Sequence, residues 1–269
     1  MKKVISFLIL FFTLNIVSED LNRLPSGVPD LNGVWQVMNT ANYNLEAHSS
    51  SAAMQMIEGP VVPIPHPLLV SLGSIGSIPG GLSVVEGGEI PYKKAALRKR
   101  DKNKKDWLNL DPEIKCYLPG VPRANYMPYP FQIFHSEEAM FFAYQYAGAV
   151  RNIYLKDPGP APIDSWMGQS WGYWDNDTFV VKASGFNDQT WFDRSGNHHS
   201  DKLKVTERYT PINNHIIEYE ALIEDEEVFT KPWKIKMNLY KRTGQDAQII
   251  QFKCVEFVEE LMYGKYRAK

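Results

Sequence analysis

The sequence predicts a mainly β protein in which an antiparallel meander closes into a lipocalin-like barrel or, alternatively, packs as a two-sheet sandwich. From residue 131 onward apolar and polar residues alternate, and turn residues recur at intervals of about ten, as in strands joined by hairpins. Consecutive strands place their apolar residues on one face, and burying that face requires a closed barrel or a second sheet. A length of 269 residues without a visible internal repeat suits one such domain.

The composition is that of a folded protein with a nearly balanced charge. Hydrophobic residues make up 44% of the chain and charged residues 22%, which excludes a disordered or collagen-like protein. Lys and Arg total 29 against 31 Asp and Glu, so the formal net charge is -2. This total does not favour nucleic acid as the main partner.

Residues 1–18 have the layout of a secretory signal peptide. Lys2 and Lys3 precede an apolar run at 4–14, and Ser18 ends a suitable cleavage site. The apolar run is too short to span a bilayer, and no later stretch reaches the roughly 18 apolar residues of a membrane helix. We therefore expect a periplasmic or secreted protein, exported by a Sec-type signal, without a transmembrane segment.

After the signal peptide, an extended polar lead-in is expected at 19–32, and a single domain is expected over 33–269. The domain begins with a short strand at 33–38. Residues 48–88 are rich in Ser, Gly and Pro, so we predict an excursion without regular structure. A stretch of this length is usually either disordered or a lid that packs over a site.

One basic surface helix is predicted at 92–107, where good helix formers include eight Lys or Arg. Two interpretations of its charge stay open. It is either a solvated face or a patch for an acidic glycan or a lipid headgroup. A short helix is also expected at the C-terminus. The remaining strands are predicted at 131–135, 139–146, 150–155, 169–174, 178–184, 202–210, 215–223, 233–240 and 247–254.

Cys116 and Cys254 are the only two cysteines of the chain. In an oxidising compartment two cysteines can pair with each other, whereas the cytosol keeps them reduced. We predict one disulfide, and the alternative is two separate buried thiols.

One acidic residue, Glu207, falls on the predicted core face of its strand. It alternates in phase with Leu203, Val205 and Tyr209, because side chains on a strand alternate with period two. An acid in that position must find a partner or look into a wet cavity. The alternatives are a salt bridge to an arginine inside the barrel and a cavity carboxylate suited to acid-base work.

A long polar and aromatic loop at 185–201 precedes this strand, and loops at a barrel mouth often supply binding groups. By parity with Glu207, His199 aims at the interior and His198 does not. His199 beside Asp193 or Glu207 could move a proton, and the alternative is a histidine that caps the loop by hydrogen bonds. The same loop offers three candidates for ligand binding, which are Asn187, Asp188 and Trp191.

Aromatic side chains supply area and geometry for binding a sugar ring or a flat apolar ligand, although most of them belong to the core. Arg123 follows Pro-Gly-Val-Pro, so it is held on a stiff turn. It could receive a ligand carboxylate or pair with Glu207. The candidates to line the pocket are Trp166, Trp171, Tyr209 and Tyr219.

The sequence motifs of several well-known metal, catalytic and cofactor sites are absent from the chain. The chain has no HExxH, no CxxC and no pair of histidines spaced to share a strand face, so we expect no metal site. A GxSxG elbow, a P-loop and a dinucleotide fingerprint are also absent from the sequence. We therefore expect no organic cofactor.

A combined pattern extends over most of the chain beyond about residue 90. It consists of Cys116-Tyr-Leu-Pro-Gly-Val-Pro-Arg123, Ser165-Trp-Met-Gly, Gly185-Phe-Asn-Asp-Gln-Thr-Trp-Phe-Asp-Arg-Ser-Gly196, His199-Ser200, Glu207-Arg208-Tyr209 and Lys231-Pro-Trp233. This pattern resembles a large family of secreted bacterial proteins of unknown function. The resemblance implies a bacterial exported protein that contains both cysteines, and it implies no catalytic role. The chain departs from the pattern at Gln169, where a histidine is expected.

Three functional hypotheses follow. The first is a barrel that holds a small amphipathic or aromatic molecule in an internal cavity, with Glu207, His199 and Arg123 as polar contacts. The second makes the same cavity the active site of an isomerase, lyase or hydrolase, with His199 as acid or base, Asp193 orienting it and Glu207 as second carboxylate. The third is a glycan-binding module at the aromatic loops and the basic helix.

Overall fold

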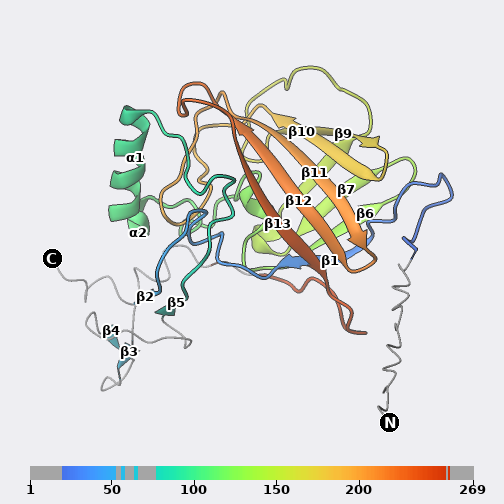
Figure 1. Cartoon of the computed structure of the whole chain (residues 1–269), viewed down its shortest axis with the longest axis horizontal. Helices are drawn as coiled ribbons and strands as arrows, with labels where there is room; N and C mark the ends of the chain where they lie inside the picture. The colour runs from blue at the N-terminus through green and yellow to red at the C-terminus, as the bar shows by residue number, and fades with distance from the viewer. Residues whose placement is uncertain (1–19, 53–55, 58–63, 66–76, 253, 255–269) are drawn as a thin grey trace, which may run out of the picture.

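The protein folds as a closed barrel of nine strands (Figure 1). The computed structural model describes residues 20–52, 56–57, 64–65, 77–252 and 254. The strands follow one another around the barrel in the order β1-β13-β12-β11-β10-β9-β8-β7-β6, and β6 pairs with β1 to close it. The mainly β class and the closed barrel are confirmed. The strand bounds are Gly33–Val37 (β1), Phe131–His135 (β6), Met140–Tyr144 (β7), Val150–Tyr154 (β8), Gln169–Asp175 (β9), Thr178–Ser184 (β10), Lys204–Asn213 (β11), Ile216–Glu224 (β12) and Trp233–Lys241 (β13).

The alternation of side chains explains why these segments form barrel strands. Along β12 every second residue from Ile217 to Ile223 is buried, and the residues between them are half-buried. The buried set of β12 is in register with the buried set of β11, so that Tyr209 lies opposite Tyr219. Because both strands turn the same parity inward, their apolar side chains join the main hydrophobic core.

One pair of neighbouring strands departs from the predicted antiparallel meander. β8 and β9 run parallel, and their register pairs are Ile153 with Ser170 and Tyr154 with Trp171. A parallel pair cannot be joined by a tight hairpin. The chain therefore crosses over through residues 155–168 before β9 begins, and this long connection contains Trp166.

The predicted tenth strand at 247–254 is wrong, because the described residues of this range are not in a strand. The barrel offers it no free edge, since β1 already pairs with β13 on one side and with β6 on the other. The predicted signal peptide and the predicted C-terminal helix both lie outside the described residues.

The end of the described chain is held by the predicted disulfide, which is confirmed between Cys116 and Cys254. Beside it, the ring of Phe252 packs against Tyr129 at 4.9 Å and Tyr146 at 5.3 Å between centroids. Phe252 and Cys254 are therefore joined to earlier parts of the chain by an aromatic cluster and a covalent bond.

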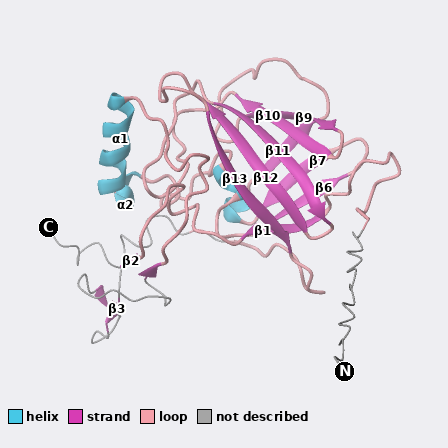
Figure 2. Ribbon diagram, in the orientation of Figure 1, coloured by secondary structure: helices cyan, strands magenta, loops and turns pink. Residues whose placement is uncertain are grey.

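The predicted basic helix is confirmed as α1 (Lys94–Lys105), which is shorter than expected and is followed by α2 (Trp107–Leu110). α1 stands at one side of the molecule, outside the barrel (Figure 2). Two short 3-10 turns, η1 (Arg123–Asn125) and η2 (Tyr146–Gly148), lie elsewhere in the chain. None of the helices in the described ranges is long and apolar enough to cross a membrane.

The excursion predicted at 48–88 contains short ladders in its described parts, where no regular structure was expected. The bounds of their two-residue strands are Ser51–Ala52 (β2) and Ser77–Ile78 (β5), which pair with each other, and Met56–Ile57 (β3) and Ile64–Pro65 (β4), which also pair.

The disulfide should contribute measurably to stability. It joins residues separated by 138 positions, so its loss frees a long loop in the unfolded chain. We expect the double substitution Cys116→Ser and Cys254→Ser to lower the free energy of unfolding by about 2 to 4 kcal/mol. Urea unfolding of the variant and of the native protein with and without reductant measures this. Equal urea midpoints for all samples would show that the disulfide does not contribute to the stability of the fold.

Candidate functional site

The carboxylate of Glu207 lies inside the barrel, 0% exposed, at the centre of a hydrogen-bond network. Its Oε2 accepts a hydrogen bond from Nη2 of Arg151 on β8 at 2.5 Å. Its Oε1 accepts hydrogen bonds from three further groups, which are Nδ2 of Asn125 at 2.7 Å, the hydroxyl of Tyr219 at 2.8 Å and the hydroxyl of Tyr209 at 2.9 Å. Glu207 is therefore the buried partner of an arginine inside the barrel, one of the two alternatives predicted for it.

The interior around this ion pair is filled by the protein's own aromatic side chains, where the sequence predicted a ligand cavity. The ring of Tyr209 lies 5.1 Å from that of Tyr219 and 5.5 Å from that of Phe142. The two tyrosine hydroxyls, predicted as ligand contacts, both donate to Glu207. Burial, and then the charge of Glu207, raises the pKa of both tyrosines well above the ordinary value. Tyr209 and Tyr219 are therefore uncharged and form part of an ordered core.

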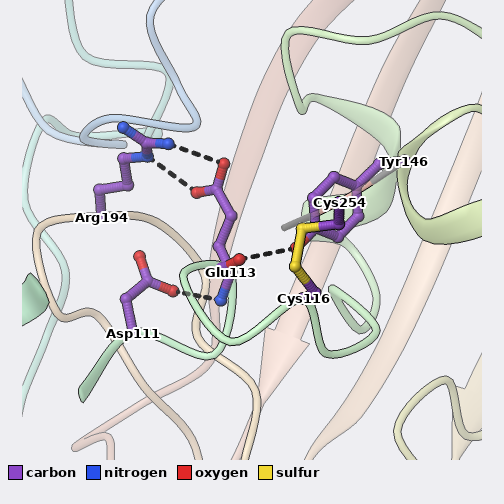
Figure 3. Close-up of a disulfide and its surroundings, with 6 residues drawn as sticks. All are labelled: Asp111, Glu113, Cys116, Tyr146, Arg194 and Cys254. Atoms are coloured by element: carbon purple, nitrogen blue, oxygen red, sulfur yellow. Dashed lines mark hydrogen bonds and ion pairs between the residues drawn. A yellow bond between two sulfur atoms is a disulfide. The ribbon is translucent and has the colours of Figure 1, made fainter. Parts of the chain in front are cut away.

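Arg123 belongs to a second buried ion network. Its Nη1 and Nη2 donate to the carboxylate of Asp111 at 3.0 and 3.2 Å, and Nη2 also donates to Glu113 at 2.6 Å. Glu113 accepts two more hydrogen bonds from Arg194, at 2.8 and 2.9 Å (Figure 3). The predicted pairing of Arg123 with Glu207 is wrong, because two carboxylates nearby in sequence occupy the guanidinium.

His199 is buried, but it does not form the predicted acid-base pair. Its Nε2 lies 2.6 Å from Oγ1 of Thr190, and its Nδ1 lies 2.8 Å from the carbonyl oxygen of Ser200. Both ring nitrogens are thus occupied by neutral groups. Burial lowers the pKa of His199 from its ordinary value, and the hydrogen bond to Ser200 opposes this. The arrangement matches the alternative of a histidine that fixes the loop.

Asp193, the predicted orienting partner, instead organises the turn that contains it. Its oxygens accept hydrogen bonds from the backbone N–H groups of Leu45 and Ser195, both at 2.9 Å, and from Nδ2 of Asn197 at 2.6 Å. Burial raises the pKa of Asp193 to about 6, although these hydrogen bonds oppose the shift. Asp193 therefore stabilises its own turn and ties the 185–201 loop to the backbone at Leu45.

An open cleft between α1, α2 and the 185–201 loop brings together residues of a different kind. Its volume is about 260 Å³. Trp166 stands at the cleft with its ring 4.9 Å from that of Tyr117, and Trp191 is 7% exposed within it. The polar and charged side chains that line it include Lys99, Lys115, Asp188, Gln189 and His198. We call this the Trp166 cleft.

The Trp166 cleft depends on close contact between α1 and the loop at Gly196. A Cβ atom on this glycine would lie 2.6 Å from the backbone carbonyl of Arg100, and its φ of +82° is itself unfavourable for other residues. Across the contact, the buried side chain of Asn103 donates to the carbonyl oxygen of Gly196 at 3.2 Å. The hydroxyl of Tyr92 donates to Oδ1 of Asn197 at 3.0 Å. α1 is therefore held against the 185–201 loop by close backbone packing and by a hydrogen bond.

His198, the neighbour of the predicted catalytic histidine, is the imidazole that lines the cleft. Burial, and then the positive charge of Lys99, lowers its pKa to about 4. Its ring stacks on Tyr92 at 5.9 Å between centroids. Its Nδ1 is buried and has no hydrogen-bond partner among the described residues. At neutral pH this imidazole is therefore uncharged.

The other predicted ligand contacts lie in different places. Asp188 lines the Trp166 cleft, whereas Asn187 is half-buried beside it and accepts from the backbone of Gln189 at 3.3 Å. Trp171 is on the outer face of β9, where its ring lies 5.3 Å from Nζ of Lys182. The structure thus brings Trp166, Trp191 and Asp188 together and leaves Trp171 apart, because Trp171 has the outward parity of its strand.

Sequence reasoning did not single out most of the residues that line this cleft. The strand parity that selected His199 implied that His198 faces the opposite way. No feature of the sequence indicated that His198 would lie beside α1. The basic composition of 92–107 did identify the helix itself. The residues that were not singled out include Lys99, Lys115, Gln189 and His198.

Comparison of the chain with protein-family models, with curated proteins and with solved structures finds no match.

Proposed function

We propose that this is an exported bacterial binding protein that holds a small amphipathic or aromatic ligand in the Trp166 cleft, outside the barrel. The observation that carries the proposal is the meeting of Trp166, Tyr117 and Trp191 with two lysines in one open recess. Aromatic faces bind sugar rings and flat apolar molecules, and a few polar groups fix the ligand's orientation. Export is supported by the disulfide, which is typical of oxidising compartments.

The contrast between the buried polar networks and the open cleft also favours a binding function. The barrel interior is an ordered core around the ion pair of Arg151 and Glu207. His199 binds groups of its own loop, and Asp193 binds its own loop and the backbone of Leu45. The Trp166 cleft, by contrast, includes exposed or half-buried side chains that form no ion pair with any described residue, among them Lys99, Lys115 and Asp188. A rigid barrel that presents a recessed site on its loops is a common way to build a binding protein.

The alternative of a cofactor-independent enzyme with a His199 and carboxylate pair receives less support. General acid-base catalysis needs the imidazole and the carboxylate within hydrogen-bond reach of each other or of one water. The nitrogens of His199 face Thr190 and Ser200 instead, and Glu207 is enclosed by its four donors.

The test compares two tryptophans. Native purification and mass spectrometry of the co-eluting compound would supply the ligand, and calorimetry would measure its affinity. Trp166→Ala should weaken binding about tenfold or more, because an aromatic anchor in a recess dominates affinity. Trp171→Ala, on the outer barrel wall, should leave the affinity unchanged. Equal affinity of both variants, with both still folded by circular dichroism, would remove the Trp166 cleft as the site.

A further inference from the structure

α1 continues the Trp166 cleft as an array of positive charges. Its sequence KAALRKRDKNKK contains a single acid, Asp101, and its last turn is basic. Arg100 pairs with Glu46 and with Asp101. The other basic side chains of the helix are exposed and form no ion pair with any described residue, and they are Lys94, Arg98, Lys99, Lys102, Lys104 and Lys105.

The geometry of the helix connects this array to the cleft. Lys99 belongs to both, because it lines the cleft and is one of the exposed cations. Arg98, Lys102 and Lys105 are spaced four and three residues apart, so they lie along one side of the helix over about 10 Å. The helix is fixed to the loop by the contact at Gly196. The positive array therefore has a fixed position relative to the aromatic recess.

We propose that the Trp166 cleft and α1 together bind an anionic polysaccharide, which goes beyond the small ligand of the proposed function and rests on that function only for the use of the cleft. One sugar ring stacks on Trp166, and Asp188 and Gln189 accept and donate hydrogen bonds with its hydroxyls. The acid groups of the neighbouring sugars pair with the cations of α1. The ligand thus runs from the recess along the helix.

Two observations favour a glycan over the other polyanions. Trp191, only 7% exposed, lies recessed in the cleft, where a flat lipid surface does not reach its ring. Asp188 lines the recess beside Trp166, so the phosphate backbone of a nucleic acid entering the recess would meet a carboxylate. A polysaccharide needs only the short cationic strip and offers hydroxyls to the carboxylate of Asp188.

The experiment titrates the full chain with polygalacturonate, with neutral dextran of matched length and with a 20-nucleotide oligothymidylate at two salt concentrations. Polygalacturonate should bind, more weakly at high salt, and dextran should bind at least tenfold more weakly. A triple variant with Lys99→Gln, Lys102→Gln and Lys105→Gln should lose about tenfold in affinity for polygalacturonate, since exposed ion pairs each add modestly. The control removes the same charge elsewhere, with Lys156→Gln, Lys182→Gln and Lys204→Gln.

The outcomes separate this inference from the proposed function. Loss of polygalacturonate affinity in the α1 triple variant and in Trp166→Ala supports both. Loss in the α1 variant alone supports the cationic strip and counts against the cleft as the ring site. Equal affinity of the α1 variant and the control variant overturns the inference, even if a small ligand still needs Trp166. Oligothymidylate binding that is as tight as polygalacturonate binding, with the same dependence on α1, overturns it in favour of nucleic acid.

Discussion

Replacing Glu207 by Gln should lower the free energy of unfolding by about 3 to 5 kcal/mol, although the side chain keeps its shape. The substitution leaves the guanidinium of Arg151, 3% exposed, without its counter-charge inside the barrel. A buried charge without a partner costs far more than a lost hydrogen bond. The amide also brings two donors toward Asn125 and the two tyrosine hydroxyls, which now donate to the carboxylate.

Urea unfolding at pH 7 measures this effect, and the structure offers a matched control. Asp175 pairs with Arg208 on the barrel surface at 3.0 Å, with side-chain exposures of 45% and 40%. Asp175→Asn makes the same chemical change and should cost less than about 1 kcal/mol, because an exposed ion pair adds little. The double variant Arg151→Met with Glu207→Gln should be more stable than Glu207→Gln alone. Near-normal stability of Glu207→Gln would mean that the carboxylate is not a structural counter-ion.

The inward face of the barrel strands could be predicted from the sequence because it depends on a local rule. Alternation with period two identified Glu207 as buried among apolar neighbours, and the structure places it at 0% exposure. The identity of its partner did not follow from that rule. Arg151 is 56 residues away in sequence, on β8, and the two meet only because the barrel closes.

The same limit explains the errors at the loops. The sequence suggested Arg123 as a partner for the core acid, but Asp111 and Glu113, which lie 12 and 10 residues before it, pair with its two terminal nitrogens. β11 begins at Lys204, so the parity of that strand does not extend to the two preceding histidines. The position of His198 depends on α1, which is packed against Gly196 by a contact between distant segments.

The second large effect is expected at the buried network beside the disulfide, where Arg123→Met should lower the free energy of unfolding at pH 7 by about 3 to 5 kcal/mol. Arg123 is 1% exposed, and it pairs with both Asp111 and Glu113. Methionine fills part of the volume but leaves the two carboxylates with only the charge of Arg194, which pairs with Glu113. Arg23→Met is the matched control, because Arg23 pairs with Asp177 at the surface.

The dependence of this loss on pH distinguishes uncompensated charge from poor packing. In the native protein burial disfavours ionisation of Glu113, but the charges of Arg194 and Arg123 outweigh burial and lower its pKa to about 2. A carboxylate with a lowered folded pKa stabilises the protein above its ordinary pKa, and this stabilisation is lost as the pH falls from about 4.5 toward 2. Without Arg123 that pKa rises, so Glu113 takes up a proton on mild acidification and the buried charge disappears. The difference in unfolding free energy between native protein and variant should therefore shrink between pH 7 and pH 4, whereas a packing defect would leave the difference constant across this range.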